Sequence, residues 1–79
     1  MYIQGFVFLS GEKTPYGYKA IIEILISDNI RIPVEIDFDE DGHSSYEALN
    51  KYEHPDREFL EDLIHYAVFK KYLLPLKSN

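Results

Sequence analysis

The run Asp37-Phe38-Asp39-Glu40-Asp41-Gly42 is the stretch of this chain whose residue types and spacing are best suited to chemistry. Carboxylates stand at its first, third and fifth positions, and a glycine follows at the sixth. Alternate side chains of a tight turn can direct their oxygens at one point, and carboxylate oxygens are ligands that hard cations such as Ca²⁺ prefer. Asp37, Asp39 and Asp41, together with the backbone carbonyl of His43, are therefore a candidate calcium site.

This spacing resembles the first half of an EF-hand calcium loop, and the resemblance ends at Gly42. The bidentate glutamate expected at the twelfth position is missing, because Ala48 stands there and Glu47 is one place early. A strand is also expected before the run, where an EF-hand has a helix. The alternative is an acidic turn that keeps an edge strand soluble and favours the N-terminus of the next helix.

Other groups that could carry chemistry do not form a recognisable site. The chain has no cysteine, so thiolate metal sites and cysteine nucleophiles are excluded. Its three histidines are too far apart in sequence for helical metal-ligand spacing. His65 has Glu61 and Asp62 one turn before it, which is more typical of pairing on a solvated helix face than of a general base. We assign no catalytic residue and no cofactor, and we expect that the protein is not an enzyme.

Composition limits the class of partner. The 79 residues carry 14 acidic side chains against 8 lysines and arginines, a net charge of −6. This charge argues against binding nucleic acid through its phosphates and favours a basic protein surface. The N-terminus lacks the features of a secretory signal, and no apolar run is long enough for a membrane span. We therefore expect a soluble, cytoplasmic protein with a single compact domain over residues 1–79.

Tyrosine supplies seven of the chain's aromatic residues, and tyrosine is enriched at protein interfaces. We expect a small acidic non-catalytic protein-binding module that engages a basic macromolecular partner, a profile shared by inhibitors, immunity-type proteins and phage-encoded antagonists as a class. The alternatives are a calcium-responsive module and a structural homo-oligomer subunit, with a homodimer as its simplest form. The expected steering charges are Glu35, Asp37, Asp39, Glu40 and Asp41, and the expected anchors are Tyr46, Tyr52, Phe69 and Tyr72.

The elements that must position these residues follow from hydrophobic periodicity. Apolar and β-branched residues predict strands over residues 2–10, 18–27 and 30–38, in the antiparallel order 1-2-3. Pro33 places the third strand at the sheet edge, because proline cannot donate to a ladder on both sides. A two-residue turn at Asp28-Asn29 would bring Lys19 and Glu23 to the core face. A three-residue loop, Asp28-Asn29-Ile30, is therefore the preferred register.

Two helices are expected after the strands, which completes a β-β-β-α-α unit of the α+β class. The first is short and begins at Ser44, because Ser44 and Glu47 have the spacing of a capping box. The second covers residues 55–74, with Pro55 in its first turn and Pro75 just beyond its end. At 100° per residue its expected core stripe is Phe59, Leu60, Leu63, Ile64, Ala67 and Leu74. Val68, Phe69 and Tyr72 fall away from this stripe. With Leu73, and with Tyr66 on their flank, they predict an apolar interface, as does the second apolar face of the first strand; the alternative is that the short helix covers them.

Overall fold

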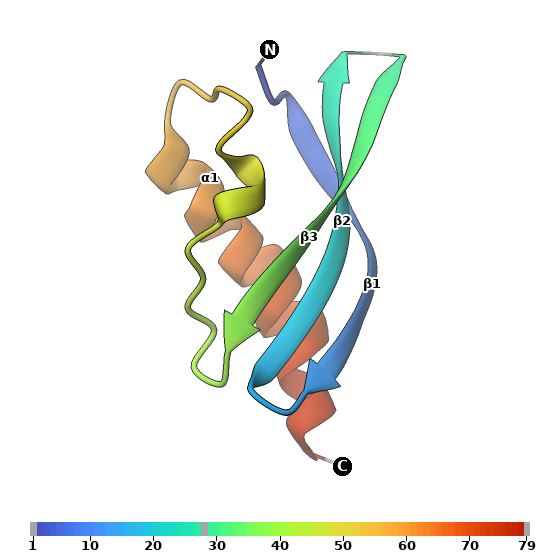
Figure 1. Cartoon of the computed structure of the whole chain (residues 1–79), viewed down its shortest axis with the longest axis vertical. Helices are drawn as coiled ribbons and strands as arrows, with labels where there is room; N and C mark the ends of the chain where they lie inside the picture. Colours follow the sequence, from blue (N-terminus) through green and yellow to red (C-terminus); the bar gives the residue numbers. More distant parts are fainter. Residues whose placement is uncertain (1, 28, 79) are drawn as a thin grey trace.

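The structure is a computed structural model, and it describes residues 2–27 and 29–78. Three antiparallel strands, β1 (Gly5–Thr14), β2 (Gly17–Ser27) and β3 (Ile30–Asp39), form one sheet in the order β1-β2-β3. A 3₁₀ turn, η1 (Glu47–Leu49), precedes the C-terminal helix, which crosses one face of the sheet (Figure 1). This helix consists of α1 (Arg57–Ile64), the π-helical η2 (His65–Leu73) and the 3₁₀ segment η3 (Leu74–Ser78). The predicted α+β class and the predicted strand order are confirmed.

The central strand β2 supplies one half of the core. Its even-numbered side chains from Tyr18 to Ile26 are all buried, and the side chains between them are half-buried on the opposite face of the sheet. This alternation follows from the two-residue period of a strand. The helix covers the even-numbered side, while the other face of the sheet has no second layer over it (Figure 1). β3 forms one edge of the sheet and carries Pro33, as the sequence predicts.

The first hairpin is longer than the sequence indicates. β1 continues through Thr14, which pairs with Gly17 across the predicted turn at Pro15-Tyr16. Leu9 is an extra residue in β1, because the pairing steps from Phe8 opposite Ile22 to Ser10 opposite Ile21. This β-bulge keeps the aromatic side chains before it and Gly11 after it on the core face. The strand therefore continues past a glycine that was expected to end it.

The second hairpin corrects the predicted register. Ile30 pairs with Ser27, so it belongs to β3 and not to a three-residue loop, while Asp28 lies outside the described residues. The ladder then pairs Ile24 with Ile32 and Ile22 with Val34. The predicted three-residue loop would instead pair Ile26 with Ile32 and Ile24 with Val34. Ile26 is the extra residue, because Leu25 is opposite Arg31. This second β-bulge lets the even-numbered residues of β2 and β3 share the core face. A regular ladder after so short a turn would not place them there.

The predicted capping box is wrong. The backbone of Tyr46 is in the left-handed region (φ 52°), and the helical turn that follows covers only Glu47–Leu49. The hydroxyl of Ser44 accepts a hydrogen bond from the Tyr46 N–H at 3.1 Å, so it caps no helix. A left-handed residue interrupts helical geometry between Ser44 and Glu47. The expected short helix is therefore reduced to a single 3₁₀ turn.

The long helix begins two residues later than predicted and buries a face that overlaps the predicted one only in part. Its N-cap is Asp56, whose side chain accepts a hydrogen bond from the Phe59 N–H at 3.1 Å, and Pro55 precedes this cap. The buried positions are Leu60, Ile64, Val68, Phe69 and Leu73. Leu60, Ile64 and Val68 are four residues apart, whereas Val68 and Leu73 are five apart within the π-helical segment, whose turns bond i to i+5. Phe59, Leu63 and Ala67 are exposed, which corrects the predicted core stripe, and Val68, Phe69 and Leu73 are buried, which corrects the predicted interface.

Candidate functional site

The acidic run forms a tight turn at the end of β3. The Asp39 carboxylate accepts hydrogen bonds from the N–H groups of Asp41 and His43, both at 2.9 Å. The Asp39 N–H donates to the His43 carbonyl at 2.9 Å, and the Gly42 N–H donates to the Asp39 carbonyl at 3.0 Å. The bond from the His43 N–H is the main reason that the pKa of Asp39 is lowered from its ordinary value of 3.8. Asp39 is therefore the residue that holds this turn together.

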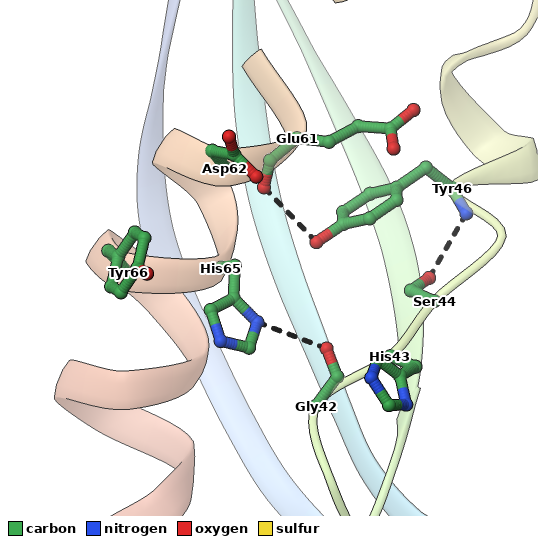
Figure 2. Close-up of a pocket in the computed structure, with 8 residues that line it drawn as sticks. All are labelled: Gly42, His43, Ser44, Tyr46, Glu61, Asp62, His65 and Tyr66. Atoms are coloured by element: carbon green, nitrogen blue, oxygen red, sulfur yellow. Dashed lines mark hydrogen bonds between the residues drawn. The ribbon is translucent and has the colours of Figure 1, made fainter. Parts of the chain in front are cut away.

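Gly42 fastens the turn to the helix. Its carbonyl oxygen lies 3.1 Å from Nδ1 of His65 (Figure 2), and because a carbonyl can only accept, this contact requires a proton on Nδ1. The His65 ring stacks on Phe69 with 5.3 Å between ring centroids. Gly42 has φ +88°, and a Cβ placed on it would lie 2.5 Å from Cε2 of Phe69. The acidic turn is thus held against the core at a position where only glycine fits.

A hollow of about 380 Å³ lies between this turn and the helix (Figure 2). The Tyr46 hydroxyl donates to the Glu61 carbonyl at 3.3 Å and closes one side of the hollow. Burial, with smaller effects from the charges of Glu61 and Asp62, raises the pKa of Tyr46 to about 12, so the hydroxyl stays protonated at neutral pH. The hollow is lined by Gly42, His43, Ser44, Tyr46, Glu61, Asp62, His65 and Tyr66.

A second hollow of about 230 Å³ lies between β3 and residues 44–48. Its lining includes three acidic residues, Glu35, Asp37 and Glu47, and two serines, Ser44 and Ser45. The remaining lining residues are Ile36, Tyr46 and Ala48. These polar groups are hydrogen-bond acceptors, which suit the ammonium group of lysine or the guanidinium group of arginine.

The predicted steering charges are all exposed along β3 and the turn that follows it, and Glu35 and Asp37 line the second hollow with Glu47, which the sequence analysis had not selected for binding. We call Glu35, Asp37, Asp39, Glu40, Asp41 and Glu47 the acidic region. Lys19 lies 3.1 Å from Glu35, and this contact is the main cause of its raised pKa, to which Asp37 and Glu12 also contribute. Lys13 lies 3.7 Å from Glu40.

The predicted anchors are not brought together. Tyr46 and Phe69 are only 6% and 2% exposed, so they are core residues and not surface anchors, which corrects that expectation. Tyr52 is half-buried against the core. Tyr72 is 41% exposed, and its ring stacks on Phe8 of β1 with centroids 4.2 Å apart. Phe69 was predicted to lie outside the core because 3.6 residues per turn were assumed, whereas the π-helical turns place it in the core.

The residues that the structure places together as possible cation ligands differ from the predicted set. Asp39, Asp41 and His43 can each bring one ligand atom within 4.8 Å of the others, and all three are exposed. Asp37 is not in this group, and the His43 carbonyl accepts the N–H of Asp39. Calcium binding by Asp37, Asp39 and Asp41 stays an alternative hypothesis.

Sequence reasoning missed the contribution of the helix to the first hollow. Glu61 and Asp62 were recognised only as neighbours of His65, yet Glu61 bonds to Arg57 at 2.8 Å and His65 bonds to the turn. The usable signal was the glycine after the acidic run, because a glycine at such a position often marks a close approach of another segment. The residues that Gly42 approaches are Phe69 and His65, and their position depends on the tertiary structure.

Comparisons of this chain with protein families, with characterised proteins and with solved structures found no match. The class that the fold and the site define is therefore architectural: a small α+β domain in which a helix backs a three-stranded sheet and an acidic turn closes one end. Among the residues described, no helix combines the length and apolar character that crossing a membrane would require.

Proposed function

We propose that this protein is a non-catalytic protein-binding module whose acidic region engages a basic surface of another protein. Its role would be that of an inhibitor, an immunity-type protein or a phage-encoded antagonist. The observation that carries the proposal is the unbalanced charge of the acidic region. Glu35 and Glu40 each meet a lysine, whereas Asp37, Asp41 and Glu47 form no ion pair within residues 2–27 and 29–78.

The local backbone supports this role because it orders the carboxylates before any partner arrives. Asp39 closes the turn with four hydrogen bonds, and Gly42 holds the turn against the helix. Pre-ordered groups lose less conformational entropy on binding than flexible ones do. Complementary charge also accelerates association, and the effect weakens as salt screens it. We expect association that is fast at low salt and strongly salt-dependent.

The two hollows offer places for basic side chains of the partner. The hollow beside β3 presents Asp37 and Glu47, and the hollow beside the helix presents Asp62. Hydrogen bonds between charged groups are roughly twice as strong as neutral ones, and arginine can make two at once with one carboxylate. A partner that places lysine or arginine in either hollow would gain specificity as well as electrostatic attraction.

The test compares two variants of equal net charge. Asp41→Lys/Glu47→Lys reverses two carboxylates of the acidic region that neither cap the turn nor form an ion pair within the described chain. Glu23→Lys/Glu58→Lys reverses one carboxylate on β2, which pairs with Arg31 at 3.6 Å, and one on α1, and neither belongs to the acidic region. Each variant and the wild type are immobilised and exposed to lysate of the source organism and of its host, and the retained proteins are identified by mass spectrometry.

The proposal predicts one dominant protein that the wild type and the control variant retain and that the acidic-region variant loses. The rate at which this retained protein associates with the wild type should fall strongly as salt is raised from about 20 mM to about 500 mM, because the screening length falls several-fold. Equal retention by all three proteins, or an association rate that does not change with salt, would refute the proposal.

A further inference from the structure

The C-terminal helix carries a second apolar stripe that faces away from the sheet. Phe59, Leu63 and Tyr66 are 55%, 42% and 65% exposed, and all three lie outside the core cluster. Their spacing of four and then three residues places them on one side of the helix. Single exposed apolar side chains are common, but a continuous row of large ones usually marks an interface. We call these three residues the outer stripe.

Charges beside the outer stripe change sign along the helix. Glu58 and Asp62 are exposed near its start, and Lys70 and Lys71 are exposed near its end. No ion pair of the described chain uses any of these four side chains, although the Lys71 ammonium lies over the ring of Tyr72. A second helix running in the opposite direction would therefore bring its basic end to the acidic end of the first. The charges beside the outer stripe of one copy are therefore complementary to those of an antiparallel second copy.

We propose that two copies of this chain form a symmetric dimer by packing their outer stripes against each other in antiparallel orientation. When Leu63 of one copy is placed opposite Tyr66 of the other, Glu58 is level with Lys71 of the second copy. Symmetry repeats each contact, as is required of a two-fold interface. A shallow crossing angle of about 20° keeps both charged ends within reach of each other. This interface lies on the helix and does not use the acidic region.

The size of the stripe sets the expected strength of the dimer. Stable interfaces bury on the order of 1,600 Å² in total, and three side chains per copy with their charged neighbours supply less than this. We therefore expect weak self-association, with half-dimerisation at roughly 10–300 μM, rather than a permanent dimer. This range is accessible to analytical ultracentrifugation.

The test measures the dissociation constant by sedimentation equilibrium for the wild type and for variants of exposed residues, with circular dichroism as a check of folding. Leu63→Ser should weaken the dimer at least about tenfold, because it removes an apolar contact on both copies. Glu58→Lys alone and Lys71→Glu alone should each weaken it, since each places like charges opposite each other. The double variant Glu58→Lys/Lys71→Glu should restore the wild-type dissociation constant.

The control removes apolar surface elsewhere. Leu9→Ser changes a side chain of β1 that is 50% exposed, comparable to Leu63, and it should leave the dissociation constant unchanged. A wild type that stays monomeric up to about 1 mM, well above the range expected for such an interface, would overturn the proposal. So would self-association that depends on Leu9 and not on Leu63, which would assign the interface to β1, or a double variant that does not recover. None of these results bears on retention of a basic partner by the acidic region.

Discussion

Replacing Gly42 with alanine tests whether the acidic turn is held against the core as the structure shows. Gly42 has φ +88°, which side chains of L-residues rarely adopt, and the new methyl group would lie 2.5 Å and 2.6 Å from two ring carbons of Phe69. Phe69 cannot move away easily, because its ring is packed against Tyr18, Phe38 and His65. Both the backbone and the side chain therefore oppose the substitution.

The expected loss of stability combines these two causes. A side chain in the left-handed region costs about 1–2 kcal/mol, and an extra methyl group in a packed core costs about 1–3 kcal/mol. Reduced freedom of the unfolded chain offsets roughly 0.4–1 kcal/mol. We expect a net loss of about 2–3 kcal/mol in the free energy of unfolding, which lowers the melting temperature of a domain this size by roughly 10–20 °C.

The assay is urea unfolding followed by circular dichroism, with Gly5→Ala as a matched control. A Cβ on Gly5 would lie 3.7 Å from Leu25, which is ordinary van der Waals contact. The control should therefore be neutral or stabilising by up to about 1 kcal/mol. If Gly42→Ala loses less than about 0.5 kcal/mol, the typical effect of a neutral surface change, the described contact between the turn and Phe69 is wrong.

Four further predictions concern single groups. Asp56→Ala should cost about 1 kcal/mol in urea unfolding through loss of the N-cap, and an unchanged midpoint would contradict the cap. Tyr18→Phe should leave stability unchanged or raise it by about 1 kcal/mol, because the buried hydroxyl has no hydrogen-bond partner among the described residues; a clear loss would reveal one. The pKa of Asp39 is lowered in the folded protein, so its contribution to stability is full above the unfolded pKa, near 3.8, and is lost as pH falls through the folded pKa. Asp39→Asn should therefore flatten the stability curve below about pH 5, and parallel curves there would refute this. Calcium at about 10 mM should leave the amide resonances of Asp39, Asp41 and His43 unshifted, since the loop lacks the bidentate glutamate; saturable shifts would establish the calcium-responsive alternative.

The strand faces could be predicted from the sequence, but the register could not. Alternation from Ile30 to Phe38 is a local property, and it correctly identifies the core face of β3. The pairing partners depend on single extra residues at Leu9 and Ile26, which no alternation pattern contains. A bulge is selected by the need to bury apolar groups on both sides of it, so it becomes visible only when the neighbouring strands and the helix are in place.

The helix shows the same limit in another form. Its existence follows from apolar spacing and from acidic residues near its start, but the choice of buried face assumed 3.6 residues per turn throughout. The change to π-helical turns at His65 moves Val68 and Phe69 into the core. The exposed carboxylates of the acidic region could be predicted because charge is a property of each residue, whereas Tyr46 and Phe69 are placed by packing.

The order of the strands has a consequence for how the chain folds. Each ladder joins strands that are neighbours in sequence through short connections, so the sheet can form with little loss of loop entropy. Isolated hairpins form in about 1–10 μs, but they are only marginally stable in water until an apolar face is covered. The buried side chains of β2 are covered by a helix that follows the whole sheet in the sequence. Docking of that helix, and not formation of the strands, is therefore the step that makes the fold persist.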